Sequence, residues 1–400
     1  MVLETATSSA SGLSIGTSAS ASTSTAARGD LSSTGRAAFE DVTISVGDQE
    51  VPVALWRPLD GADGSTPGTS YPHRISVAKI ARVLLRLGTS LPTFLDKALS
   101  LDANVQDGVE RAPDVTGSAA AAARAEQDLQ ETDSDSGRGG GTVKGALILC
   151  HGYLGSRFDL CDIAEAASKG GFVCVAPEFA ESLSNPQTTP ANLNGGSATR
   201  GEIVQSCLDL LESRFGIDAR RTALVGHSAG AGTAVLTEGR YLGRVAIAGF
   251  RKPPGPPQPL LSDPLLVICS ENDNVISLAG ILSELSQVGA PTETYDGSAE
   301  SLAELARTPP KPGQVALVKY ENGKWGEGRP APCHISFLSE RTNDAMVEVL
   351  SPLLPLAKAL GIPLLDFDTY SENRDSVDVA RDLVPAIVSW LTRIADADIG

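Results

Sequence analysis

The chain has 400 residues, of which 42% are hydrophobic, and this supply of apolar side chains excludes intrinsic disorder of the whole chain. The 49 acidic residues outnumber the 32 basic ones and give a formal net charge of −17, which repels nucleic-acid phosphates at long range. We therefore expect no nucleic-acid partner. No apolar run reaches the roughly 18 residues that a membrane span needs, so the sequence predicts a soluble protein.

The N-terminal segment is rich in Ser and Thr, which make up 16 of residues 1–36, and it has neither a charged start nor an apolar run. This composition predicts a disordered low-complexity tail, followed by one domain over residues 37–400. A transit peptide into an organelle, for example a chloroplast, is the alternative for such a leader. The six cysteines form no CxxC pair and several lie in apolar runs, which indicates buried free thiols and a cytoplasmic location.

Three stretches precede the expected core. Alternating apolar and polar residues over 42–46 and 51–56, on either side of a Gly-Asp turn, predict an antiparallel hairpin at the sheet edge. The basic amphipathic pattern that opens residues 76–100 predicts helices, which either pack on the core or form a cap or lipid-facing surface. Residues 102–141 are rich in acidic and small residues and end in three glycines, which predicts a disordered insertion.

From residue 145 onward, short apolar runs alternate with segments of helical periodicity. Runs that are apolar throughout are typical of strands covered on both faces, and the alternation of strand and helix predicts a parallel sheet. We therefore expect an α/β doubly wound core of about eight strands, counting the hairpin, flanked by helices. The expected core strands lie at 146–150, 172–176, 222–225, 245–248, 265–269 and 315–320. The expected helices lie near 157–170, 198–215, 229–239, 276–289, 344–360 and 376–396.

A pentapeptide at the end of the third core strand carries the first chemical signal. Gly226-His-Ser-Ala-Gly230 matches the G-x-S-x-G pattern and lies between an expected strand and an expected helix. The two glycines permit a tight turn, which holds the Ser228 hydroxyl above the sheet beside the helix N-terminus. The pattern predicts that Ser228 is a catalytic nucleophile, and an ordinary glycine-rich turn is the alternative.

A serine nucleophile needs a base that is oriented by a third group. Of the four histidines, His334 follows the last core strand, where the chain order Ser, acid, His places the base. For the acid we expect Asp273, which follows the strand at 265–269, with Glu271 as the nearby substitute. An Asp before a helix also serves as an N-cap, so capping is the alternative role of Asp273.

Acyl transfer also needs two N–H donors for the tetrahedral oxyanion. The backbone of Ala229, directly after the nucleophile, supplies one. The turn His151-Gly-Tyr-Leu-Gly155 after the first core strand is the expected source of the other, with Tyr153 as the donor. This chemistry requires neither a metal nor an organic cofactor, and the expected partner is a small-molecule ester.

Residues 150–178, with an HG-turn and the ending GGFVCVAPE, resemble the corresponding stretch of the platelet-activating factor acetylhydrolase family of α/β-hydrolases. Residues 69–85 and the His334-Ile-Ser-Phe337 signature are also similar to that family. The resemblance covers roughly residues 38–100 and 145–340. It implies the α/β-hydrolase fold, a lipid ester as substrate, removal of short or oxidised acyl groups from a phospholipid, and transient contact with a membrane surface.

Two features depart from that family. Its elbow usually reads G-H-S-F-G-G, whereas Ala229 and Ala231 replace the Phe and the last Gly here. The family's acid follows the strand that here ends in Ile247-Ala-Gly249, so the matching position is a glycine. Either Asp273 has taken over or the triad is incomplete, and the second case describes a non-catalytic ligand-binding protein on a hydrolase scaffold. Chlorophyllases share the HG-turn and the Val175-Ala-Pro177 pattern, which makes a chlorophyll or other bulky lipid ester the alternative substrate.

Overall fold

The computed structural model of the chain describes fifteen stretches, all within one compact unit that spans residues 33–400. The predicted tail up to residue 35 and most of the predicted 76–100 and 102–141 stretches lie outside the described residues. The described residues are 36–59, 70–76, 100–106, 110–111, 143–182, 184, 198–252, 263–308, 311–323, 330–351, 354–359, 366–367, 369–370, 373 and 375–398.

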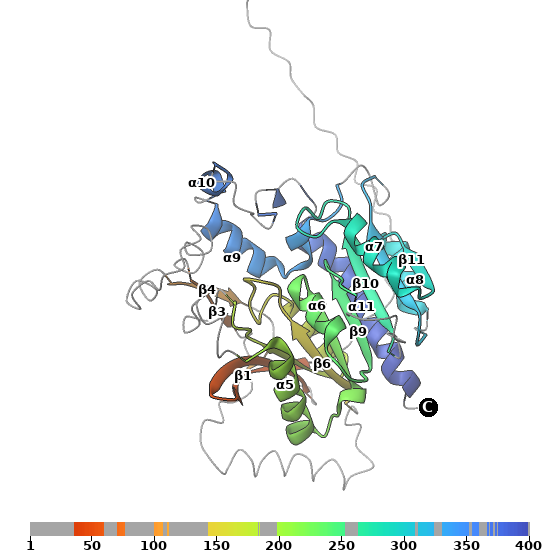
Figure 1. The fold of residues 1–400 in the computed structure, drawn as a ribbon. Coiled ribbons are helices and arrows are strands. Elements are labelled where there is room, and N and C mark those ends of the chain that lie inside the picture. The colour runs from red at the N-terminus through yellow and green to blue at the C-terminus, as the bar shows by residue number, and fades with distance from the viewer. Residues whose placement is uncertain are drawn as a thin grey trace, which may run out of the picture. The chain divides into compact units, whose positions relative to one another are not determined.

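The core is one sheet of ten strands (Figure 1). The strands are β1 (Arg36–Val46), β2 (Gln49–Leu59), β5 (Glu110–Arg111), β6 (Gly145–Cys150), β7 (Phe172–Pro177), β8 (Thr222–His227), β9 (Gly243–Ile247), β10 (Leu265–Ser270), β11 (Thr292–Tyr295) and β12 (Val315–Tyr320). Their order is β11-β12-β10-β9-β8-β6-β7-β2-β1-β5. All pairings from β11 through to β7 are parallel, whereas β2 runs antiparallel to both β7 and β1. The predicted mostly parallel sheet with an antiparallel hairpin is therefore confirmed.

The sheet has two strands more than the sequence predicted. Three of the four residues of β11 are exposed, so this strand lacks the continuous apolar pattern of its neighbours. Strand β5 pairs with β1 over two residues only. A separate antiparallel pair joins β3 (Ser70–Ser76) to β4 (Ser100–Gln106). The structure thus differs from the predicted insertion at 102–106 and 110–111, because backbone pairing with distant strands overrides local composition.

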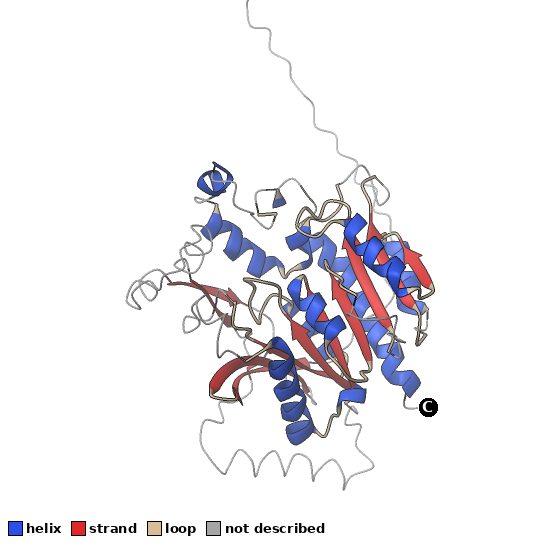
Figure 2. Ribbon diagram, viewed as in Figure 1, coloured by secondary structure: helices blue, strands red, loops and turns tan. Residues whose placement is uncertain are grey.

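Helices cover both faces of the sheet (Figure 2). Side chains of α4, α8 and α11 share one hydrophobic cluster with the strands, whereas those of α5 and of α6 with α7 belong to two other clusters. The single helix expected over 344–360 is two helices in the structure, α9 (Glu340–Leu350) and α10 (Leu354–Ala359). Pro352 lies between them in the sequence, and a proline interrupts a helix because it has no N–H to donate. The helices are α4 (Cys161–Lys169), α5 (Arg200–Phe215), α6 (Ala229–Leu236), α7 (Leu278–Val288), α8 (Ala299–Arg307), α9 (Glu340–Leu350), α10 (Leu354–Ala359) and α11 (Ser376–Asp398), with 3-10 turns η2 (Ala219–Arg221) and η3 (His334–Phe337).

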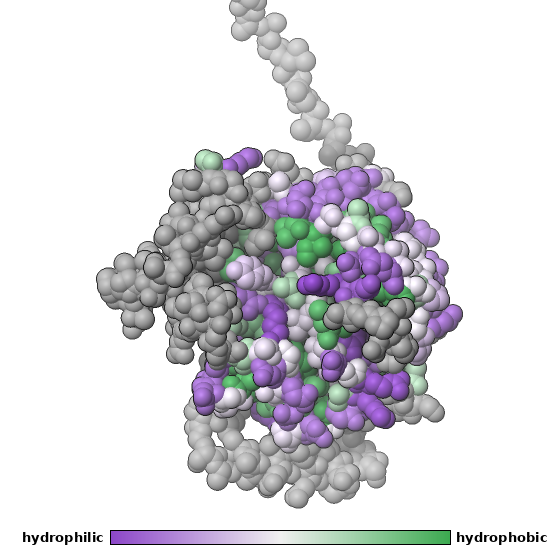
Figure 3. Space-filling model, in the orientation of Figure 1, coloured by the Kyte–Doolittle hydropathy of each residue, from purple (hydrophilic) through white to green (hydrophobic). Residues whose placement is uncertain are grey.

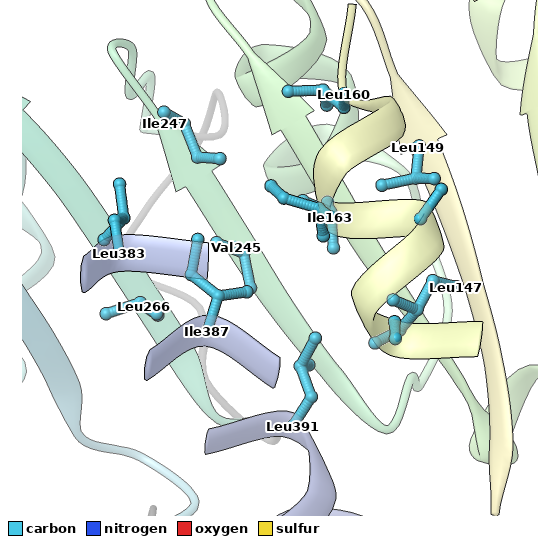
Figure 4. Close-up of a cluster of buried hydrophobic side chains, with 14 of the residues drawn as sticks. Leu147, Leu149, Leu160, Ile163, Val245, Ile247, Leu266, Leu383, Ile387 and Leu391 are labelled. Carbon is cyan, nitrogen blue, oxygen red and sulfur yellow. The ribbon is translucent and has the colours of Figure 1, made fainter. Parts of the chain in front are cut away.

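Successive side chains of the central strands are buried on opposite faces. Leu147 and Leu149 of β6 belong to the cluster with α4 and α11, whereas Ile148 between them belongs to the cluster with α5. Figure 4 shows one stripe of α11 directed at β9 and β10, and this stripe recurs at the spacing of one helix face. Its labelled members are Leu383, Ile387 and Leu391. Burial of each such side chain contributes about 1.5–3 kcal/mol, so this double-sided packing stabilises the strands whose ends carry the site.

None of the described helices is long and apolar enough to span a membrane. On the face drawn in Figure 3, hydrophilic residues are interspersed with smaller groups of hydrophobic ones. All six cysteines are buried and none forms a disulfide, as the sequence predicted. Burial raises the pKa of the Cys150 and Cys174 thiols to about 12, so both stay protonated near neutral pH.

Candidate active site

The direction of the strand order changes at β6. Strand β6 pairs with β7 on one side and with β8 on the other, so the direction in which strands are added reverses there. In open α/β sheets, ligands bind beyond the carboxyl ends of the strands at such a point. The segments that leave β6, β8 and β10 carry the predicted turn at 151–155, Ser228 and Asp273, and Figure 1 shows β6 and β10 in the same sheet.

Ser228 occupies a strained turn between β8 and α6. Its backbone has φ +56° and ψ −117°, which non-glycine residues rarely adopt. Both flanking glycines are required, because a Cβ at Gly226 would collide with the backbone of Gly230 and a Cβ at Gly230 would collide with the carbonyl of Cys150. The N–H of Ser228 donates to the carbonyl of Ile247 at 2.9 Å. The side chain is partly exposed at the N-terminus of α6, so its hydroxyl is accessible.

The structure brings Ser228, His334 and Asp273 together. His334 Nε2 lies 2.9 Å from Ser228 Oγ, and His334 Nδ1 lies 2.8 Å from Asp273 Oδ2. A carboxylate only accepts hydrogen bonds, so Nδ1 carries the proton and Nε2 accepts the serine O–H. His334 and Asp273 are 3% and 4% exposed, so the pair is shielded from water. The arrangement can take the hydroxyl proton of Ser228 and stabilise the imidazolium that results.

Asp273 contacts both His334 and the backbone of its own loop, whereas the N-cap of α7 is Ser277 and not Asp273, as the alternative had it. Asp273 Oδ1 accepts the backbone N–H groups of Val275 at 2.9 Å and Ile276 at 2.7 Å, which caps the turn before α7. Its Oδ2 is left for His334. Glu271, the substitute acid, instead accepts the backbone N–H of Asn322 at 2.8 Å.

The residues that carry the two expected oxyanion donors both lie close to Ser228 in the backbone. Ala229 is the first residue of α6, where an N–H has no partner within the helix. A Cβ added at Gly152 would lie 3.2 Å from Ser228 Cβ, so the backbone just before Tyr153 packs directly against the serine. Among the described residues, the Tyr153 N–H has no hydrogen-bond acceptor. Both N–H groups therefore belong to backbone next to Ser228, and neither has a backbone acceptor within the described part of the chain.

The serine in a strained strand-to-helix turn and the antiparallel second strand of a parallel sheet belong to one architecture. The chain has the α/β-hydrolase fold. No family model matches the sequence, and no curated protein matches it. Among solved structures, the chain is similar to a ferulic acid esterase from Streptomyces cinnamoneus, at 15% identity over 90% of this chain and 89% of that one, with a TM-score of 0.47. It is also similar to a cold-adapted esterase from an Arctic intertidal metagenomic library, at 11% identity over 78% and 92% of the two chains, with a TM-score of 0.36.

Within this fold, Gly249 has a steric reason to be a glycine. A Cβ there would lie 2.8 Å from the carbonyl oxygen of Ser228 and 3.3 Å from the side chain of Ala231. At a contact under 3.0 Å one of the two atoms must move, and here the neighbouring atom is the backbone carbonyl of Ser228, so any side chain at position 249 would disturb the strand-to-helix turn. The carboxylate that contacts His334 comes from beyond β10 instead, at Asp273.

The carbonyl of Gly152 accepts three hydrogen bonds, which set the direction of the Tyr153 N–H. The donors are His151 Nδ1 at 2.7 Å, the Gly155 N–H at 3.2 Å and Arg200 Nη2 at 3.5 Å. A trans peptide is planar, so its C=O and N–H point in opposite directions. Holding the Gly152 carbonyl therefore fixes where the Tyr153 N–H points.

Arg200, at the start of α5, is a residue that the sequence analysis missed. Its Nη1 also donates to the carbonyl of His151 at 3.0 Å, and its guanidinium pairs with Glu181 and lies 4.0 Å from the centre of the Phe179 ring. A cation in the first turn of a helix opposes the helix dipole. That unfavourable placement, directly after the Thr199 cap, is a sequence signal for a second role.

We expect Arg200→Met to lower kcat about tenfold while KM changes little, because a less well oriented Tyr153 N–H stabilises the oxyanion less. Steady-state kinetics on an activated ester measures both constants. Arg214→Met is the matched control, since Arg214 lies in the last turn of the same helix and pairs with Glu40. Equal kcat values for the two variants would contradict the orienting role of Arg200.

His227, inside the elbow, supports the backbone of the base. A carbonyl only accepts hydrogen bonds, so His227 Nε2 donates to the carbonyl of His334, at 2.9 Å. Burial first, and the neighbouring His334 second, lower the pKa of His227 to about 3. His227 is therefore neutral at physiological pH, and its ring holds the loop that carries His334.

The low pKa of His227 predicts a loss of stability in acid. In the unfolded chain His227 becomes protonated below about pH 6.5, whereas in the folded protein it stays neutral down to about pH 3. The free energy of unfolding therefore falls as pH falls between these two values, by at most roughly 1.4 kcal/mol per pH unit. We expect His227→Gln, which keeps an N–H donor, to lose less stability than the parent between pH 7 and pH 4.5. Urea unfolding at both pH values measures this, and parallel losses in the two proteins would contradict it.

Proposed function

We propose that this chain is a serine ester hydrolase. The observation that supports it best is the continuous chain of contacts from Ser228 Oγ through the His334 ring to Asp273 Oδ2, at 2.9 and 2.8 Å. A partly exposed hydroxyl, a buried base and a buried acid in this order are what nucleophilic acyl transfer needs. Two unused N–H groups beside the hydroxyl complete the requirements.

In the proposed reaction, Ser228 Oγ attacks the ester carbonyl carbon and its proton passes to His334 Nε2. The carbonyl oxygen becomes an oxyanion that accepts hydrogen bonds from the N–H groups of Ala229 and Tyr153. When the intermediate collapses, the bond to the leaving oxygen breaks, and the proton moves from His334 to that oxygen, which leaves as the alcohol. A water molecule then attacks the acyl-serine with His334 again as base, and it releases the acid and restores Ser228.

For the substrate, we propose short or oxidised acyl groups on a phospholipid, with transient contact to a membrane surface. The support is the resemblance of residues 150–178 and of the His334-Ile-Ser-Phe337 segment to the platelet-activating factor acetylhydrolase family. A chlorophyll or other bulky lipid ester is the second candidate, favoured by the Val175-Ala-Pro177 pattern. A ligand-binding protein without catalysis is the third, and the contact of Asp273 with His334 weighs against it.

A substrate panel tests this proposal. The purified full chain is assayed with p-nitrophenyl acetate, with a phospholipid that bears an acetyl group at its second position, with the same phospholipid that bears a long acyl chain, and with chlorophyll a. Turnover of the acetyl phospholipid well above the long-chain form supports the proposed specificity, whereas preference for chlorophyll a supports the second candidate. If folded protein hydrolyses none of the four, the third candidate replaces the first two.

A further inference from the structure

One carboxylate near the C-terminal end of the chain contacts both loops that hold the triad. Asp366 Oδ2 accepts the backbone N–H of His334 at 3.0 Å and the backbone N–H of Asn274 at 3.1 Å. His334 is the proposed base, and Asn274 directly follows the proposed acid, Asp273. A single oxygen atom therefore joins two loops whose side chains must meet at 2.8 Å.

The placement of Asp366 is costly for the fold. The residue is 4% exposed, and a buried carboxylate is tolerated only when its oxygens are hydrogen-bonded. Its backbone lies in the left-handed region, at φ +67°, which Asp and Asn adopt more readily than other non-glycine residues. Its carbonyl accepts the N–H of Thr369 at 3.2 Å, which closes the turn. The buried carboxylate and the left-handed backbone are both unfavourable, and both occur at the residue whose carboxylate binds the backbone of His334 and Asn274.

The residues around Asp366 contact the same two loops. Phe367 belongs to a hydrophobic cluster with Ile335, directly after the base, and the partly buried Leu154 of the 151–155 turn packs against that cluster. Asn373 Oδ1 accepts a hydrogen bond from Asn272 Nδ2 at 3.0 Å, one residue before the acid. Phe367 and Asn373 therefore add side-chain contacts beside the proposed base and the proposed acid.

We propose that Asp366 is a positioning residue of the hydrolytic site, an inference that rests on the proposed function. Its carboxylate holds the N–H of His334 while His227 Nε2 holds the carbonyl of the same residue, so the backbone of the base is held at both ends. Its second bond, to Asn274, fixes the acid loop relative to the base loop. What matters is the position of an acceptor oxygen, and its negative charge is not required.

Two substitutions separate the acceptor from the rest of the side chain. Asp366→Asn retains an oxygen that can accept both N–H groups and tolerates the left-handed backbone, but it lacks the charge. Asp366→Gly fits the same backbone and has no acceptor. We expect kcat per titrated active site to stay within about threefold of the parent in Asp366→Asn and to fall about 10- to 100-fold in Asp366→Gly, with KM changed less than about threefold in both.

Asp218→Gly is a control that removes a carboxylate from the backbone N–H of Arg221, at 3.1 Å, in the turn before β8. The concentration of reactive active sites is measured with a fluorophosphonate probe, and kcat is calculated per reactive site. Unfolded protein in a sample therefore does not lower the measured kcat. The proposal is overturned if kcat of Asp366→Gly is no lower than that of Asp218→Gly. It is also overturned if Asp366→Asn falls as far as Asp366→Gly, which would assign the effect to charge. Should the Gly variant fail to fold, a tenfold loss in Asp366→Asn is still enough to reject the proposal.

The parent protein distinguishes this failure from failure of the proposed function. If the parent neither hydrolyses esters nor reacts with the probe at Ser228, the hydrolase proposal fails. If the parent is active and the Asp366 variants match it, only the positioning role fails.

Discussion

Ser228→Ala is expected to lower ester turnover by about four to six orders of magnitude, to a level set by binding and the oxyanion donors alone. In the proposed reaction, the hydroxyl is the one group of the triad that forms a bond to the acyl group, and alanine has no hydroxyl to take its place. KM should change little, because the methyl group of alanine fits where the serine Cβ lies. Initial rates of p-nitrophenyl acetate hydrolysis, with protein concentration matched, measure the loss.

A covalent probe tests directly whether Ser228 reacts as a nucleophile. A fluorophosphonate should label the parent on the peptide that contains Ser228, and it should leave Ser228→Ala unlabelled. Ser286→Ala is a suitable control, since Ser286 is exposed on α7 and its hydroxyl donates to the carbonyl of Ser283 in the same helix. Label on another serine, or undiminished turnover in Ser228→Ala, would reject Ser228 as the nucleophile.

Asp273→Asn is expected to lower kcat by about three to four orders of magnitude. The amide that replaces the carboxylate does not stabilise the imidazolium. It can also donate a hydrogen bond to His334 Nδ1, which would place the ring proton on Nε2, so that Nε2 could no longer accept the serine O–H. The fold should survive, because the amide oxygen can still accept the N–H groups of Val275 and Ile276 that Oδ1 now holds. Kinetics together with a thermal melt separate the two effects.

Glu271→Gln is the matched control for the acid. Glu271 lies in the same loop and bonds to the backbone of Asn322 rather than to His334, so its amide variant should retain most of the parent kcat. A loss in Glu271→Gln as large as that in Asp273→Asn would mean that the loop, not the contact with His334, decides activity. Near-parental turnover in Asp273→Asn would mean that Asp273 does not act as the acid of the site.

The sequence by itself determined the layered fold and the strand-to-helix turn that carries Ser228. Continuous apolar runs such as 146–150 and 265–269 are buried on both faces and can only be inner strands, so their pattern predicts a parallel sheet. The G-x-S-x-G pattern that identifies Ser228 lies within five consecutive residues, although the steric requirement for Gly230 comes from the distant carbonyl of Cys150. These signals are local, because they depend on residues close in sequence.

The tertiary structure alone decided which carboxylate meets His334 and what holds the site in place. Asp273 is 61 residues from His334, Arg200 is 49 residues from the carbonyl it binds at His151, and Asp366 is 92 residues from Asn274. Each of these contacts is a hydrogen bond between groups brought together by the tertiary fold, and a spacing of that length has no period that a sequence pattern could reveal. The sequence did not predict β5 or β11, because β5 is short and β11 is largely exposed. Both are strands through their pairing with β1 and β12, which lie elsewhere in the sequence.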